Sequence, residues 1–322
     1  MSYEIMSIAA TVTQYIGPPI IVLGIITNSL NIVILRQQAL KDHSCSLYFV
    51  VLSTSNLAYT CIATTVNLLL DGYGINLTQH SNIFCKFISY FINFCSHLSA
   101  FMLVLASIDR YCASSSNVHR RNLSSYRTAR WVVFGILLFL SLLMLPNAIV
   151  FNAYDDDAVG CASNAASLFN QIYLIINVTI YVLITPLLMI LFGFLTIYNT
   201  QQPIRHRVVV IHRRPNEKQL VRMLLVQVSS HLVLNLPFCI VYFMLILPIE
   251  FRSTVMFYFL YVIFKIPFQI NFITPFFLYI LSAKVYRTEL IRLMKQILRI
   301  RNGRTVHPIN RTLQTDQHQS TL

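Results

Sequence analysis

The sequence predicts an all-α membrane protein, a seven-transmembrane helix bundle with a short amphipathic eighth helix. Of the 322 residues, 56% are hydrophobic and 11% are charged, whereas ordinary soluble domains carry about 25% charged residues. The charges lie between seven apolar runs, each long enough as a helix to cross the roughly 30 Å hydrocarbon core of a bilayer. Lipid offers backbone groups no hydrogen-bond partners, so these runs are expected to be helices and not open strands. The seven expected spans are residues 16–35, 46–70, 87–108, 130–151, 168–198, 220–247 and 254–281.

The first run starts too late and is too long for a cleaved signal peptide. We therefore expect residues 1–15 to be a short extracellular tail and residues 16–281 to form the transmembrane domain. Residues 284–301 repeat apolar side chains at helical spacing and carry basic ones on other faces, which predicts an amphipathic helix on the membrane surface. Calmodulin binding is the alternative for the same pattern. Residues 302–322 are polar and are expected to form a disordered cytoplasmic tail.

The basic residues predict the orientation, because lysine and arginine concentrate on the cytoplasmic side of membrane proteins. With the amino terminus outside, all but three of the 24 lysines and arginines fall in cytoplasmic segments, the exceptions being Lys86, Arg252 and Lys265. Acidic residues gather in the outer segments, among them Asp71 and the run 155–157. We expect a multi-pass plasma-membrane protein with its amino terminus extracellular and its carboxyl terminus cytoplasmic. The basic loops then face an anionic leaflet, which explains the net charge of +13 without a nucleic-acid partner.

The sequence argues against an enzyme. It contains no His-Glu-x-x-His, Cys-x-x-Cys, Gly-x-Gly-x-x-Gly or phosphate-loop motif. The ionisable residues deep in the spans are His97, His231 and Lys265, which are too few and too scattered for catalysis. We therefore expect no catalytic residue, no metal site and no cofactor. A transporter would show an internal repeat with interrupted helices in both halves, which the sequence lacks.

The third span carries a motif at each end. Asp109, Arg110 and Tyr111 lie at its inner end, and Cys85 lies 25 residues before Arg110, which corresponds to roughly 38 Å of helix. Together these residues resemble the rhodopsin-like (family A) G-protein-coupled receptors. The resemblance implies that Cys85 bonds the second outer loop, here through Cys161, and that Arg110 meets the heterotrimeric G protein.

The resemblance extends over nearly the whole chain. Gly24 with Asn28 is similar to the family's first-helix motif. Trp131 stands where the fourth helix usually has its tryptophan, and Pro186 and Pro237 match the prolines of the fifth and sixth helices. Proline inside a membrane helix leaves a bend where movement can concentrate.

Two more residues complete the switch that the resemblance implies. Glu217 lies 20 residues before Pro237, where some family members have an acid that pairs with the third-helix arginine. The alternative is that Glu217 faces water among neighbouring basic residues, which are Arg213, Arg214 and Lys218. Tyr279 is aligned with the tyrosine of the seventh-helix motif, because Tyr279 and Tyr286 keep the family's spacing between two aromatic residues. The implied residues for G-protein coupling and switching are Asp109, Arg110, Tyr111, Glu217 and Tyr279.

The spans also depart from the family's pattern. Asn56 stands where the family has a sodium-binding aspartate, and Asn235 stands where a tryptophan is usual. The seventh span reads Thr274-Pro275 in place of Asn-Pro, with one residue extra before Tyr279. These changes concern activation and not the fold. We expect a neutral polar network in the bundle, made of Asn28, Asn56, Ser99 and Asn271.

The ligand pocket is expected in the outer half of the bundle. Ile92 replaces the aspartate of amine receptors and Gln269 replaces the lysine of opsins, which leaves a peptide-type or orphan receptor. Lys265 is the one lysine or arginine deep within an apolar run, so it should face an acidic ligand group, snorkel to the headgroups or pair with Glu250. The expected pocket residues are Ile92, His97, Asn235, Lys265 and Gln269.

The sequence and its resemblance together predict a receptor that binds an extracellular ligand, a peptide or a small molecule, and activates a heterotrimeric G protein through the inner end of the third helix. Asn76 begins the one Asn-x-Thr sequon in an outer segment and is the expected glycosylation site. The acidic run 155–157 is typical of a solvated loop, with electrostatic steering of a basic peptide as the alternative. Membrane lipids are the further partner. The alternative functions are a seven-helix transporter and a receptor-like protein without G-protein coupling.

Overall fold

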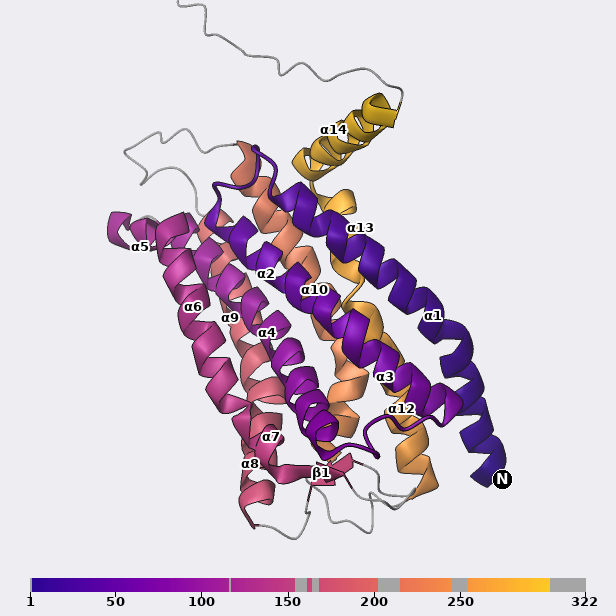
Figure 1. The fold of residues 1–322 in the computed structure, drawn as a ribbon. Coiled ribbons are helices and arrows are strands. Elements are labelled where there is room, and N and C mark those ends of the chain that lie inside the picture. The colour runs from indigo at the N-terminus through magenta and orange to yellow at the C-terminus, as the bar shows by residue number, and fades with distance from the viewer. Residues whose placement is uncertain are drawn as a thin grey trace, which may run out of the picture.

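The computed structural model describes residues 2–115, 117–153, 161–163, 168–201, 215–244 and 254–301. Figure 1 shows a bundle of long helices that run side by side. Six helical stretches are long and apolar enough to cross a membrane, and two consecutive helices bent by 43° at a short break supply a seventh. The predicted fold class, a seven-helix membrane bundle, is confirmed.

The spans consist of the following elements, in which η marks a π-helical segment. The first four spans are α1 (Ser2–Leu35); α2 (Ser44–Tyr59) with η1 (Thr60–Thr64), α3 (Thr65–Asn67) and η2 (Leu68–Gly72); α4 (Asn82–Ser114); and α6 (Tyr126–Leu143) with α7 (Leu145–Val150). The last three are α8 (Leu168–Val178) with η3 (Thr179–Ile184) and α9 (Thr185–Gln201); α10 (Pro215–Met244); and α12 (Val255–Asn271) with α13 (Thr274–Ser282). Outside the spans lie α5 (Val118–Leu123), α14 (Lys284–Arg301) and the antiparallel strands β1 (Phe151–Ala153) and β2 (Cys161–Ser163).

Helix α4 is the central element and gives the bundle its two ends. It packs against α2, α6, α7, α9 and α10. Cys85 lies in its first turn and Arg110 near its last, so we call the two ends of the bundle the disulfide end and the arginine end. In Figure 1 the amino terminus and β1 lie at the disulfide end, whereas α5 and α14 lie at the arginine end.

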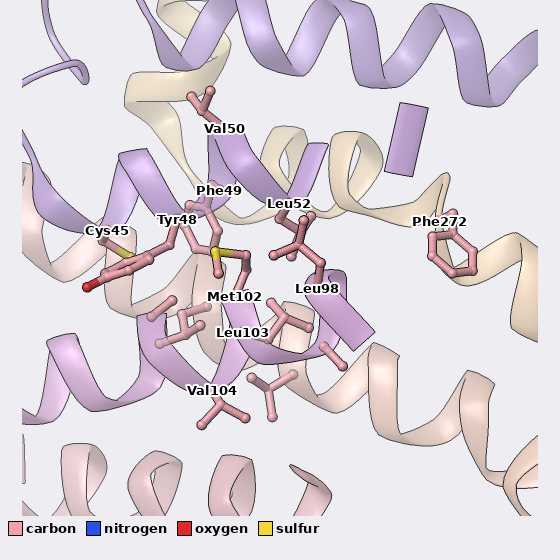
Figure 2. Close-up of a cluster of buried hydrophobic side chains, with 14 of the residues drawn as sticks. Cys45, Tyr48, Phe49, Val50, Leu52, Leu98, Met102, Leu103, Val104 and Phe272 are labelled. Atoms are coloured by element: carbon pink, nitrogen blue, oxygen red, sulfur yellow. The ribbon is translucent and has the colours of Figure 1, made fainter. Parts of the chain in front are cut away.

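The core between α2 and α4 is tightly packed with apolar side chains. Phe49 and Leu52 of α2 meet Met102 and Leu103 of α4, and all four are almost completely buried (Figure 2). Lipid tails are as apolar as these side chains, so the helices associate through close packing and hydrogen bonds and not through the hydrophobic effect. This interface therefore fixes how the two helices present their polar residues.

Helix α1 is longer than the sequence predicts. The predicted tail, residues 1–15, is helical from Ser2, and the 34 residues of α1 correspond to about 51 Å of helix. Gln14, in the added part, donates a hydrogen bond from Nε2 to the carbonyl oxygen of Gly72 at 2.7 Å. This contact ties the start of α1 to the end of η2. Helix α14, by contrast, has the bounds that the sequence predicts, Lys284–Arg301.

The seventh span breaks between α12 and α13, where the sequence predicts one helix over residues 254–281. Pro275 has no N–H, and its ring crowds the carbonyl four residues earlier, which belongs to Asn271. The hydroxyl of Thr274 donates to that carbonyl oxygen at 3.0 Å. The break thus leaves backbone acceptors in the middle of the bundle, where side chains of other helices can reach them.

Candidate functional site

Arg110 is held in a buried group of polar side chains at the arginine end of α4. Its Nη2 atom lies 2.5 Å from Oδ2 of Asp109, and its Nε donates to the same oxygen at 3.0 Å. Both side chains are 4% exposed. Nη2 also donates to the hydroxyl of Ser44, at the start of α2, at 3.3 Å. The cation is therefore compensated by a carboxylate inside the protein, as a buried charge requires.

Ser124, in the connection between α5 and α6, closes this group into a ring. Its hydroxyl donates to Oδ1 of Asp109 at 2.8 Å and lies 3.2 Å from the hydroxyl of Ser44. The ring of Asp109, Arg110, Ser44 and Ser124 joins α2, α4 and the α5–α6 connection. The sequence does not predict either serine as part of the site, because a serine beside a polar loop carries no sign of a partner 66 or 15 residues away.

Tyr111, one of the expected switch residues, lies outside this ring of four. The hydroxyl of Tyr111 accepts a hydrogen bond from Nη1 of Arg120 in α5 at 3.0 Å. The aromatic side chain of Tyr111 packs against that of Phe192 in α9, with 5.7 Å between the ring centroids. Glu217 is in the first turn of α10, and its side chain lies outside the described part of the structure.

Tyr279, the fifth expected switch residue, is fully buried in α13. Its ring lies against Phe49 of α2 and Tyr286 of α14, at centroid distances of 5.1 and 5.6 Å. Tyr286 in turn donates from its hydroxyl to Oδ1 of Asn31 in α1 at 2.5 Å. Burial raises the pKa of the Tyr286 hydroxyl well above its ordinary value, so this group stays a hydrogen-bond donor at neutral pH. Both tyrosines therefore fasten α14 to the bundle.

The predicted polar network meets at the break in the seventh span. Asn28 of α1 and Asn56 of α2 both donate from Nδ2 to the carbonyl oxygen of Phe272, at 3.0 and 3.3 Å. Ser99 of α4 donates to Oδ1 of Asn56 at 2.7 Å. Gly24 lets α1 come this close, because a Cβ there would lie 2.6 Å from Thr60. Four helices are thus joined through neutral groups.

This geometry does not suit a sodium ion. A sodium ion needs oxygen ligands and a compensating negative charge. Asn56 is neutral, and it directs its NH₂ group to the carbonyl oxygen of Phe272. We expect agonist affinity and the melting temperature to be equal in sodium and in N-methylglucamine at matched ionic strength. Asn56→Asp restores a carboxylate and is expected to create a sodium response. A large sodium-specific effect on the unchanged receptor would contradict this account.

Asn271 and Asn235 meet at a histidine that the sequence analysis did not include among the site residues. The imidazole Nδ1 of His231 in α10 lies 3.0 Å from Nδ2 of Asn271, at the end of α12. Its Nε2 lies 2.8 Å from Nδ2 of Asn235, one turn further along α10. All three side chains are buried. The expected network member Asn271 therefore contacts α10, whereas Ser99 binds Asn56, and both Asn56 and Asn28 bind the backbone carbonyl of Phe272.

The disulfide between Cys85 and Cys161 is present, as predicted. Ser81 caps α4 by accepting a hydrogen bond from the N–H of Phe84, so Cys85 stands in the first turn of a well-defined helix. The backbone N–H of Ala153, in β1, donates to Oδ1 of Asn82 at 3.2 Å. The two-stranded sheet is therefore attached to the start of α4 by the disulfide, by this hydrogen bond and by the contact of the Ser89 hydroxyl with the sulfur of Cys161 at 3.5 Å.

Lys265 has a partner that the sequence analysis did not identify. Its Nζ atom lies 2.6 Å from Oδ2 of Asp71, at the end of the second span, and the two side chains are 8% and 4% exposed. The hydroxyl of Tyr258 lies 3.4 Å from the other carboxylate oxygen, and Nζ lies 4.5 Å from the ring centroid of Tyr261. Glu250, the acid named as a possible partner, lies outside the described residues. The buried cation is thus compensated by Asp71.

Aromatic rings fill the bundle between this ion pair and the polar network. Tyr59 stacks on Phe272 at 4.1 Å, and Phe268 lies 4.5 Å from Phe238 and 6.4 Å from Tyr181. Three other expected pocket residues lie in α4 and α12. His97 of α4 packs on Tyr181 at 4.9 Å; Gln269 is buried in α12, and Ile92 is partly buried in α4.

Asn76 lies in the short connection between η2 and α4, where it forms a local turn. Its Oδ1 accepts hydrogen bonds from the N–H and the hydroxyl of Thr78, at 3.1 and 2.7 Å. Asn76 is partly exposed and is at the disulfide end. The acidic run 155–157 lies outside the described residues.

Comparison with known proteins identifies related sequences. The family model described as "7 transmembrane receptor (rhodopsin family)" matches residues 27–283. Galanin receptor type 1 of Rattus norvegicus is 27% identical over 187 residues, which cover 56% of this chain and 53% of that receptor. Galanin receptor type 1 of Homo sapiens is 33% identical over 127 residues, covering 39% and 35%, and that of Mus musculus is 33% identical over 119 residues, covering 36% and 33%. These matches span about half of the relatives' length or less.

Proposed function

Because the chain belongs to the rhodopsin family of seven-transmembrane receptors, we propose that it binds an extracellular peptide and activates a heterotrimeric G protein through Arg110. The buried Asp109–Arg110 pair at one end of α4 carries this proposal, together with the disulfide at the other end. One helix then joins the ligand-binding end to the coupling end. A receptor of this kind signals and does not catalyse a reaction on its ligand.

The ring of Asp109, Arg110, Ser44 and Ser124 is proposed to be the resting state of the switch. An ion pair and three hydrogen bonds keep the guanidinium against α2 and the α5–α6 connection. Activation moves α10 away from α4 and releases Arg110 toward the G protein. Glu217 is proposed as a further resting partner of Arg110, and Tyr111 and Tyr279 as residues that support the released state.

The proposed orientation has the disulfide end outside the cell and the arginine end in the cytoplasm of a plasma-membrane protein. The basic residues of α5 and α6 support it, since Arg120, Arg121, Arg127 and Arg130 all lie near the arginine end. A disulfide also persists only in an oxidising compartment. In this orientation Asn76 faces the lumen during synthesis, and we propose that it is glycosylated.

The proposed ligand is a peptide that enters at the disulfide end. Three relatives are galanin receptors by name, which supports a peptide and does not specify galanin for this chain. Lys265, Gln269, His97, Ile92 and Asn235 are proposed to line the pocket. An acidic ligand group that binds Lys265 must take over from Asp71, so Asp71 is included in this proposal.

A ligand-dependent assay in cells that express the chain tests this proposal. Galanin is the first probe, followed by a panel of other peptides, and dissociation of a heterotrimeric G protein is the readout. We expect at least one peptide to activate the receptor and the response to disappear in Arg110→Ala at equal surface expression. A full response in Arg110→Ala would contradict coupling through the arginine end. Peptide binding without any G-protein response would favour a receptor-like protein that does not couple.

A further inference from the structure

His231 occupies an unusual position for a histidine, because both ring nitrogens contact amide side chains inside a membrane-spanning bundle. Nδ1 lies 3.0 Å from Asn271 of α12, and Nε2 lies 2.8 Å from Asn235 of its own helix. The side chain of His231 is buried, as are both amides. The contact with Asn271 is therefore a hydrogen bond between two spans, whereas the contact with Asn235 lies within one.

The chemistry of the imidazole gives the two hydrogen bonds of His231 opposite directions. A neutral imidazole has one N–H and one lone pair, so one of the two amides must donate to it and the other must accept. Asn235 and Asn271 can each turn an oxygen or an NH₂ group toward the ring, and Oδ1 of each has no other hydrogen-bond partner among the described residues. The hydrogen bond between His231 and Asn235 within α10 thus sets whether Nδ1, the nitrogen that faces α12, carries the proton, and with it the direction of the bond between the spans.

The two partners of His231 lie next to irregular points of their helices. In α10, Pro237 follows Asn235 by two residues and removes a backbone hydrogen bond. In the seventh span, Asn271 is the last residue of α12, directly before the 43° bend. Within the break itself, Asn28 and Asn56 bind the carbonyl oxygen of Phe272. Side chains from α1, α2 and α10 therefore hold the break.

We propose that His231 is a positioning residue that couples the position of α10 to the bend in the seventh span. While α10 rests against α4, the bond from His231 to Asn271 keeps the break bent and α13 in its packed position. When α10 moves, this bond must either break or draw the end of α12 with it. The proposal rests on the proposed function for its signalling consequence, but the coupling itself is a property of the two helices.

A double-mutant cycle with a readout that needs no G protein tests the coupling. Purified receptor in lipid nanodiscs carries spin labels at exposed sites near the arginine ends of α10 and α13, and pulsed electron resonance gives the distance distribution. We expect His231→Phe and Asn271→Leu to shift this distribution alike, and the double variant to equal either single one. His231→Gln keeps a polar group that can reach Asn271 and is expected to restore the original distribution.

Gln227→Leu is the matched control, because it removes a buried amide one turn earlier on α10. Its effect on the distance is expected to be small and to add to that of Asn271→Leu. In basal nucleotide exchange on a G protein, His231→Phe and Asn271→Leu should each give an increase of about two- to tenfold, the size expected for one hydrogen bond. Additive effects of His231→Phe and Asn271→Leu on the distance would overturn the proposal. A coupled distance change without nucleotide exchange in any variant would retain the coupling and overturn the proposed function.

Discussion

Replacing Lys265 with glutamine is expected to destabilise the folded receptor by about 3–5 kcal/mol, because the carboxylate of Asp71 would remain buried without its cation. The two groups are 2.6 Å apart and less than a tenth exposed. The hydroxyl of Tyr258 also reaches this carboxylate, but a neutral donor compensates a buried charge much less than an ammonium does. Asp71→Asn is expected to have a similar effect, since it leaves the ammonium of Lys265 unpaired.

The melting temperature of purified receptor in nanodiscs measures this effect, with surface expression as a second readout. The double variant Lys265→Gln/Asp71→Asn should recover most of the lost stability, because it removes both buried charges and leaves two amides. Lys295→Gln, on the exposed face of α14, is the control and should change nothing. An unchanged melting temperature in Lys265→Gln would show that the pair contributes little and that Lys265 is available to an acidic ligand.

Removing the disulfide between Cys85 and Cys161 is expected to cost about 2–5 kcal/mol of stability, the usual range for a native bridge. The bond closes a loop over a sequence separation of 76 residues, and losing it enlarges the conformational freedom of the unfolded chain. It also releases β2 from the end of α4, where the proposed ligand enters. Cys85→Ser should therefore lower both the melting temperature and the affinity for any activating peptide.

Three variants distinguish the effect of losing the disulfide from the effect of replacing a cysteine side chain. Cys85→Ser, Cys161→Ser and the double variant should be equally destabilised, since each removes the same bond. Cys61→Ser, at an exposed free cysteine of the second span, is the matched control and should behave like the unchanged receptor. Two free thiols at positions 85 and 161 in mass mapping of the non-reduced protein would contradict the prediction.

The fold could be predicted from the sequence because its main determinant is local. A run of about 20 apolar residues has to be a helix in lipid, whatever surrounds it. The helix over 284–301 could be predicted for a similar reason, since its apolar residues recur at helical spacing. The break before Pro275 was missed because proline is tolerated in many membrane helices, and whether it bends one depends on the neighbours. Here the neighbours are Asn28 and Asn56, whose side-chain amides bind the backbone carbonyl of Phe272.

The partners within the candidate site were harder to predict, because they lie far apart in the chain. Lys265 and Asp71 are separated by 194 residues, and Asp71 by itself resembles an acid of an outer loop. A physical signal existed, since a buried cation needs an acid at the same depth. Ser44 and Ser124 carry no such signal, because only the packing of α2, α4 and the α5–α6 connection places them beside Arg110 and Asp109.

The most direct test of the central claim is nucleotide exchange on a purified heterotrimeric G protein by the receptor in nanodiscs. Asp109→Asn removes the charge that holds Arg110, so basal exchange should rise at least about fivefold, because a loss of roughly 1 kcal/mol from the resting state gives this factor and breaking a buried ion pair costs more. Ser124→Ala should raise it less, because it removes one hydrogen bond of the ring. Arg110→Ala should reduce exchange to the rate of the G protein alone. Equal exchange rates for the unchanged receptor, Asp109→Asn and Arg110→Ala, with every G-protein class and at equal folding, would contradict activation through Arg110.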